Sequence, residues 1–150
     1  MTQTETTAAG ATAPAGQCMD VEFRSGESYR VTVRGHQITV DQPAESGGDD
    51  EAPTPTELFV ASLASCVAFY AGRYLTRHGH RRDGLRVSVT YRMAQDRPAR
   101  VTDIRLAVRV PYDLPTERWP ALQAVVSHCT VHNSLVTPPI VRIELTCCTA

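Results

Sequence analysis

The sequence predicts an α+β fold in which a largely antiparallel β-sheet packs with helices. Residues 21–43, 85–94 and 101–111 alternate apolar and polar side chains, as half-buried strands do. Residues 54–78 are instead apolar over a long helical stretch. Neighbouring strand segments, grouped apart from a long helix, are typical of an antiparallel sheet and not of alternating strand–helix units.

The N-terminal third of the chain is expected to contain a tail, a small meander and a loop. Residues 1–19 are rich in Thr, Ala and Gly and lack the basic and apolar regions of a secretory signal, so we predict a disordered tail. The domain itself is expected over residues 20–150. Within it, residues 21–43 should form two or three short strands, and the acidic residues 44–55, rich in Gly and Pro, should form a loop.

A long helix is predicted directly after this loop. Thr54 fits the N-cap, Pro55 the first helical position and Glu57 the third, which together form a capping box. The helix should stop at Gly79. Over residues 58–70 it is apolar on nearly every face, which predicts burial on more than one side. We expect this apolar run to be too short, and too interrupted by Ser, to span a membrane.

The C-terminal half is expected to combine strands with short helices. The two alternating segments after the long helix should pair as a hairpin. Residues 114–136 should form two short helices with a break near residues 128–130, and Thr116 could cap the first of them. Residues 138–148 alternate again and predict a last strand.

Composition and charge narrow the classes of function. The 150 residues suit one domain with a core. A formal net charge of −1 gives no overall electrostatic attraction to nucleic acid or to an anionic membrane. Without a secretory signal, we expect a cytoplasmic location. Five cysteines without a CxxC pair do not suggest the disulfide framework of a secreted protein. They are Cys18, Cys66, Cys129, Cys147 and Cys148.

Cys66 lies in the middle of the predicted helix and has two interpretations. A buried cysteine commonly serves as a small hydrophobic core residue. A reactive thiol here would need a cation nearby, because Cys66 lies beyond the first turn, where the helix dipole lowers a thiol pKa. Arg73, two turns further along on the same face, could supply it. Arginines of the predicted meander could also do so, namely Arg24, Arg30 and Arg34.

Cys129 lies at the predicted break between the two short helices, with histidines on both sides. It could be a core residue, a resolving thiol or a metal ligand. A zinc site would combine Cys129 and His132 with two further ligands. The candidates for these ligands are Cys66, His36, His78 and His80, although a solvated loop explains the last two better.

Other candidates have simpler explanations. Glu57 could be a catalytic carboxylate, but its place in the capping box already accounts for it. Cys147 and Cys148 are either the tail of the last strand or auxiliary thiols, because adjacent cysteines rarely form a disulfide with each other. Cys18 borders the N-terminal tail and suggests no role.

Two stretches that contain the central cysteines resemble the signatures of a known family. "APTPTELFVASLASC", which ends at Cys66, and "CTVHNSL", which begins at Cys129, look like the two motifs of the OsmC/Ohr family. The similarity extends to "GHQITVD", the hairpin and the predicted last strand, over residues 20–146. It implies an OsmC-like fold with an antiparallel sheet, a long central helix and an intertwined homodimer whose sites lie at the subunit interface.

The resemblance also implies a function, the thiol-dependent reduction of hydroperoxides, especially organic ones, in oxidative or osmotic stress defence. Cys66 would be the peroxidatic thiolate that attacks the O–O bond and becomes a sulfenic acid. Cys129 would be the resolving thiol that condenses with it to a disulfide, which an external dithiol later reduces. This chemistry needs no metal and no organic cofactor. Glu57 and Arg73 are auxiliary candidates.

The chain differs from well-characterised peroxidases of this family in three places. They carry a Gly-Gly-Arg stretch whose Arg activates the thiolate, where this chain has "RSGESYR". Their catalytic Glu follows the Pro of the helix start, where this chain has Thr56; Glu57 comes one residue later, a rotation of about 100°. Their second motif reads CPVS, where this chain has Cys-Thr-Val-His from Cys129. These differences place the chain nearer the general OsmC-like branch.

The same differences support an alternative, a non-catalytic OsmC-like dimer. An apolar pocket around Cys66 would then bind a small hydrophobic ligand, or the two thiols would act as a redox sensor through a reversible disulfide without turnover. A zinc-binding module is the third possibility.

Overall fold

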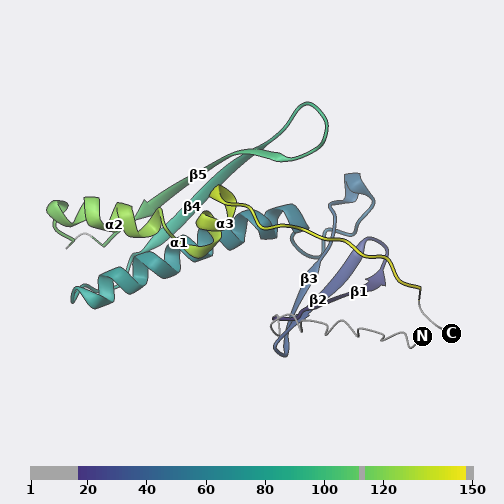
Figure 1. The fold of residues 1–150 in the computed structure, drawn as a ribbon, viewed down its shortest axis with the longest axis horizontal. Coiled ribbons are helices and arrows are strands. Elements are labelled where there is room, and N and C mark those ends of the chain that lie inside the picture. Colours follow the sequence, from purple (N-terminus) through teal and green to yellow (C-terminus); the bar gives the residue numbers. More distant parts are fainter. Residues whose placement is uncertain (1–16, 112–113, 148–150) are drawn as a thin grey trace, which may run out of the picture. The chain divides into compact units, whose positions relative to one another are not determined.

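The computed structural model describes residues 17–111 and 114–147 (Figure 1). The chain divides after Thr54 into two compact units. The predicted disordered tail falls mostly on residues 1–16, which lie outside the described residues. Residues 17–19 have no regular secondary structure.

Three antiparallel strands form the first unit, in the order β1-β2-β3. They are β1 (Asp20–Ser25), β2 (Ser28–Val33) and β3 (His36–Val40), which confirms the predicted meander. In the register of β2 and β3, Tyr29 lies opposite Val40. Gly26 and Gly35 adopt positive φ angles of 53° and 81° in the two turns, a conformation that glycine tolerates best.

The loop after β3 closes around the carboxylate of Asp41, which is buried. Its Oδ2 accepts hydrogen bonds from the backbone amides of Asp49 and Glu51, each at 3.1 Å. The amide of Glu51, and next that of Gln42, holds the pKa of Asp41 below its usual value. A short 3₁₀-helix, η1 (Ala44–Ser46), lies within the loop. One carboxylate therefore organises most of the loop backbone.

The second unit begins with α1 (Pro55–Arg77), a helix of 23 residues that starts at the predicted proline. Gly79 closes its C-terminal end with a left-handed φ of 76°. The amide of His80 donates to the Leu75 carbonyl at 2.9 Å, and the amide of Gly79 donates to the Thr76 carbonyl at 3.2 Å. These bonds satisfy carbonyls that a helix end leaves open, and they confirm the predicted stop.

Within this chain, α1 buries one face only. The buried residues recur at helical spacing and are Val60, Leu63, Val67, Ala71, Gly72, Tyr74 and Leu75. Phe59 and Phe69 lie outside this stripe and are 41% and 56% exposed. The prediction of burial on more than one side is therefore wrong for the single chain, because the elements that follow α1 cover only one side of it.

The length of α1 also corrects the expectation about membranes. By length and composition the whole helix is apolar enough to cross a bilayer, so the shortness of its apolar run does not exclude a span. One such helix is weak evidence for a membrane span, because a soluble protein's core helix meets the same two criteria. The buried stripe of α1 belongs to the core described below.

A hairpin and two short helices complete the second unit. The strands β4 (Arg86–Met93) and β5 (Val101–Arg109) pair antiparallel, as predicted. They are followed by η2 (Thr116–Arg118), α2 (Trp119–Val126) and α3 (Thr130–Val136), which confirms the predicted break. The prediction that Thr116 caps the first helix is wrong. Because η2 precedes α2, the N-cap is Arg118, which makes no capping side-chain bond.

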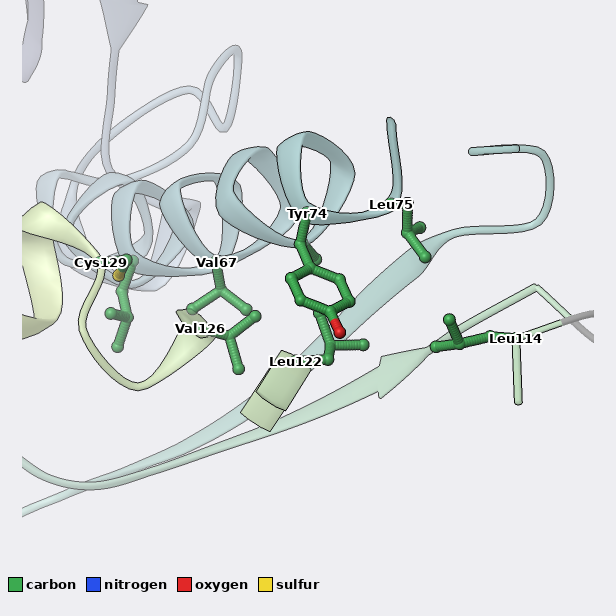
Figure 2. Close-up of a cluster of buried hydrophobic side chains, with 9 residues drawn as sticks. Val67, Tyr74, Leu75, Leu114, Leu122, Val126 and Cys129 are labelled. Carbon is green, nitrogen blue, oxygen red and sulfur yellow. The ribbon is translucent and has the colours of Figure 1, made fainter. Parts of the chain in front are cut away.

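The core of the second unit lies between α1, the hairpin and α2 (Figure 2). Its buried members are Leu63, Val67, Ala71, Tyr74, Leu75, Leu114, Leu122, Val126 and Cys129. Alternate hairpin residues pack against this cluster, among them Val87, Leu106 and Val108. Cys129 stands at the end of the cluster nearest the start of α3, so the core reaches the candidate site (Figure 2).

The predicted last strand is wrong for this chain. Residues 138–147 have no regular secondary structure, and residue 148 lies outside the described residues. A strand needs a neighbour that completes its ladder of hydrogen bonds, and no described residue pairs with this segment. Its apolar side chains are between 76% and 94% exposed: Ile140, Val141, Ile143 and Leu145.

Replacement of Gly48 by alanine is expected to destabilise the Asp41 loop. A Cβ atom at position 48 would lie 1.9 Å from the Gln42 carbonyl oxygen and 2.9 Å from Asp41 Oδ1, so backbone would have to move. We expect the free energy of unfolding to fall by roughly 1–3 kcal/mol in urea denaturation. Ser46→Ala, at an exposed position of the same loop, should stay within about 0.5 kcal/mol of wild type. Equal stability of the two variants would contradict this loop geometry.

Candidate functional site

The structure brings the thiols of Cys66 and Cys129 close together. Cys66 lies in the middle of α1 and is half-buried, whereas Cys129 precedes α3 and is fully buried, at 0% exposure. Cys66 packs against the buried cluster that contains Cys129, and it is near enough to raise the pKa of the Cys129 thiol. Residues 63 positions apart in the sequence therefore form one dithiol site.

The break between α2 and α3 determines how Cys129 is presented. Its backbone is extended, with φ of −69° and ψ of 153°, and its carbonyl accepts the first hydrogen bond of α3 from Asn133 at 2.9 Å. The side-chain amide of Asn133 also donates to the His128 carbonyl at 3.2 Å. These contacts fix the start of α3, so the Cys129 side chain is held in the core beside α1.

Tyr70 ties α3 to α1 beside the thiol pair. Its hydroxyl shares a hydrogen bond of 3.0 Å with the hydroxyl of Thr130, the first residue of α3. Tyr70 lies one helical turn after Cys66 and so on the same side of α1. The sequence interpretation missed this residue, although its spacing of four from Cys66 was an available signal.

Burial makes the two thiols electrostatically different. Desolvation raises the pKa of Cys129, and the neighbouring Cys66 raises it further. The backbone amides of His132 and Val131 act in the opposite direction and only partly offset the effect. Cys129 is therefore protonated at neutral pH. The more exposed Cys66 is the thiol that a solute reaches first.

The auxiliary candidates belong to α1 and to the first unit. The guanidinium of Arg73 stands 5.5 Å from the centre of the Phe69 ring on the exposed side of α1. Glu57 is in the first turn of α1, nine residues before Cys66, which places it on the opposite side of the helix. Arg24, Arg30 and Arg34 all belong to the first unit.

The described residues form no cluster suited to a metal. No group of three or more His, Cys, Asp or Glu side chains comes together within residues 17–111 and 114–147. His78 instead stacks on Tyr74, with ring centres 4.4 Å apart, and Nδ1 of His128 lies 2.7 Å from a backbone carbonyl of α2. The zinc hypothesis therefore has no support from these residues.

A cavity of about 350 Å³, with polar residues (Gln123, Ser127 and His132) as well as apolar ones in its lining, adjoins the part of α1 that carries Cys66. Leu63 and Val67, which flank Cys66 in α1, form one wall. Leu106, Val108 and Trp119 line it from β5 and α2, and His132 reaches it from α3. An opening of this size and lining suits the apolar part of a small organic molecule.

Comparison with known proteins agrees with this architecture. A family model described as OsmC-like protein matches residues 48–144. No curated protein sequence matches the chain.

Solved structures of similar fold come from several bacteria. A Psychrobacter arcticus 273-4 protein, described as an osmotic stress induced and detoxification response protein, matches with a TM-score of 0.75 and 24% identity, over 83% of this chain and 91% of that one. The organic hydroperoxide resistance protein OsmC of Legionella pneumophila has a TM-score of 0.61 and 16% identity, over 81% and 91%. The organic hydroperoxide resistance protein OhrB of Bacillus subtilis matches with a TM-score of 0.56 and 17% identity, over 78% of this chain and 89% of that one. At these identities the likeness shows the fold.

The raised pKa of Cys129 predicts a loss of stability at alkaline pH. A folded state that holds its thiol proton more tightly gains stability that is complete below the unfolded thiol pKa of about 8.5. This gain disappears as the pH rises through the folded pKa. Urea unfolding between about pH 7 and pH 10 should show the decline in wild type and a shallower decline in Cys129→Ala. Cys18→Ala, at an exposed thiol, should retain the wild-type slope; equal slopes in all three proteins would contradict the assignment.

Proposed function

Because the chain belongs to the OsmC-like protein family, we propose that it is a thiol-dependent peroxidase that reduces organic hydroperoxides. The observation that carries the proposal is the proximity of the half-buried Cys66 to the buried Cys129 thiol. A peroxidase of this kind needs one accessible thiol to meet the peroxide and a second thiol within bonding reach.

The proposed cycle uses both thiols and ends with a reductant from outside. The Cys66 thiolate attacks the outer oxygen of the hydroperoxide, the O–O bond breaks, and an alcohol leaves once it has taken up a proton. Cys66 is then a sulfenic acid. Cys129 attacks its sulfur, and water leaves as the disulfide forms. An external dithiol reduces the disulfide, which suits a cytoplasmic location. No cofactor takes part.

Two observations favour an organic peroxide over hydrogen peroxide. The cavity beside Cys66 is lined on one part by Leu63, Val67 and other apolar residues, and on another by Gln123, Ser127 and His132. Burial of an alkyl group against the apolar part would contribute to substrate binding. Two of the structures that share the fold, from Legionella pneumophila and Bacillus subtilis, are organic hydroperoxide resistance proteins.

We further propose that the protein is a homodimer. Two apolar surfaces of the single chain lack a cover among the described residues: the side of α1 with Phe59 and Phe69, and the segment of residues 138–147. Large exposed apolar patches commonly mark protein interfaces. A second copy would supply the missing neighbour for the unpaired segment and make α1 a helix buried on two sides.

Peroxide turnover tests the function directly. Wild type with an organic hydroperoxide and a dithiol should consume peroxide, and Cys66→Ser should fall to the rate of free thiol. Cys129→Ser should still be oxidised once but accumulate the sulfenic acid, and Cys18→Ser should behave as wild type. Intact mass after one equivalent of peroxide reports the oxidation state of each variant.

Two outcomes of this assay would replace the proposal. Stoichiometric disulfide formation without turnover, across several peroxides and dithiols, would identify a redox sensor. An unmodified Cys66 that nevertheless allows a small hydrophobic molecule to bind would identify a non-catalytic binding protein.

The dimer is tested by a charge in the unpaired segment. Ile143→Glu should reduce the mass in solution from twice the chain mass of 16.4 kDa to one chain mass, measured by light scattering. The reason is that a carboxylate buried against apolar residues is strongly unfavourable. Arg142→Gln, on the alternate side of the same segment, should remain dimeric. A wild type of one chain mass at micromolar concentration would refute the dimer.

A further inference from the structure

We propose that the imidazole of His132 accepts the proton of the Cys129 thiol when that thiol attacks the oxidised Cys66. This inference rests on the two-thiol chemistry of the proposed function and assigns a role to a residue that the chemistry has so far left unused. His132 is the fourth residue of the stretch "CTVH" and lines the cavity beside the thiols.

The need for a proton acceptor follows from the burial of Cys129. In the reduced protein, burial and next the neighbouring Cys66 raise the pKa of Cys129, so this thiol holds its proton. Because a thiolate is the nucleophile in disulfide formation, the proton must then leave a site that is closed to solvent.

The other titratable and charged groups around His132 are already engaged. On α1, the Tyr70 hydroxyl is bonded to Thr130 at 3.0 Å. On β5, Asp103 lines a second cavity with His132, but its Oδ2 accepts from Arg105 at 3.0 Å. At the end of α2, Nδ1 of His128 lies 2.7 Å from a backbone carbonyl. The same elements also carry Glu57, Arg73, Tyr74 and Arg77 on α1 and Arg105 and Arg109 on β5, and none of these lines the cavities that His132 lines.

His132 has the free nitrogen and the position that the step requires. Its Nδ1 is buried and has no hydrogen-bond partner among the described residues, an unfavourable state that calls for an explanation. Cys129 is the N-cap of α3, and His132 is the third helical residue. The backbone amide of His132 acts on the Cys129 thiol, which makes the two residues direct neighbours at the start of α3. A helical side chain leans toward the N-terminus, so the His132 ring extends toward the end of α3 where Cys129 lies. The adjoining cavity gives the ring room to turn.

The proposed step is balanced in atoms and charge. Nδ1 of the neutral imidazole, in the tautomer with its proton on Nε2, takes the Cys129 proton. The thiolate forms the bond to the Cys66 sulfur as the sulfur–oxygen bond of the sulfenic acid breaks. The departing hydroxide takes a proton from the imidazolium and leaves as water, so His132 returns to its neutral form.

An aromatic disulfide that releases a coloured thiolate tests this step without any peroxide. The parent protein carries Cys18→Ser, Cys147→Ser and Cys148→Ser, so that only the paired thiols react. The first release of colour reports the modification of Cys66. The second reports the attack of Cys129 on the resulting mixed disulfide, a reaction that again requires loss of the Cys129 proton.

His132→Gln should leave the first release unchanged and slow the second at neutral pH by at least about tenfold. The second rate should then recover toward the parent rate as the pH rises and Cys129 ionises unaided. In His132→Ala, added imidazole should restore it. His128→Gln, the matched control, should keep both phases.

Three results would overturn the assignment. One is a second phase in His132→Gln within about twofold of the parent at neutral pH. Another is a slow second phase that neither high pH nor imidazole restores to the parent rate, in a variant whose circular dichroism matches the parent. That pattern would indicate a structural role for His132. The third is a parent without a second phase, because Cys129 would then not reach Cys66. A failure of peroxide turnover overturns the proposed peroxidase and leaves this assay unaffected.

Discussion

Cys129 packs against α1 where the chain turns from α2 to α3, and the candidate site depends on this contact. The same side chain belongs to the apolar core with Val67 and Val126 and lies close to the thiol of Cys66. The position of the sulfur is therefore maintained by the packing that stabilises the second unit. A change in the core near α2 would alter the geometry of the dithiol as well as the stability of the fold.

Different degrees of burial also give the two thiols different chemical properties. Burial in the core disfavours the thiolate form of Cys129, whereas Cys66 is half-buried on the helix and accessible to small solutes. In the proposed cycle, this difference in accessibility and pKa would order the two thiols in time, with attack by Cys66 before resolution by Cys129. The hydroxyl bond between Tyr70 and Thr130 links α1 to α3, the helices at which the two thiols lie.

Local signals in the sequence predicted most of the elements and only part of the site. Proline at the start and glycine after the end gave the limits of α1, and alternation gave the hairpin, because these features depend on nearby residues. The last strand and the second buried side of α1 could not be judged in this way, since both depend on a neighbour outside the sequence window. Residue spacing likewise cannot show which of several neighbours Arg73 contacts, and in the structure that neighbour is Phe69.

If the chain forms the proposed homodimer, its uncovered C-terminal segment makes folding depend on protein concentration. Residues 138–147 present alternating exposed apolar side chains on a backbone that pairs with no described strand, and such a segment can also template aggregation. Pro138, Pro139, Arg142 and Glu144 interrupt or flank this template, as gatekeeper residues do in other aggregation-prone stretches. Newly synthesised chains would thus either form the dimer or aggregate through this segment. The rate of dimerisation would determine how much folded protein forms.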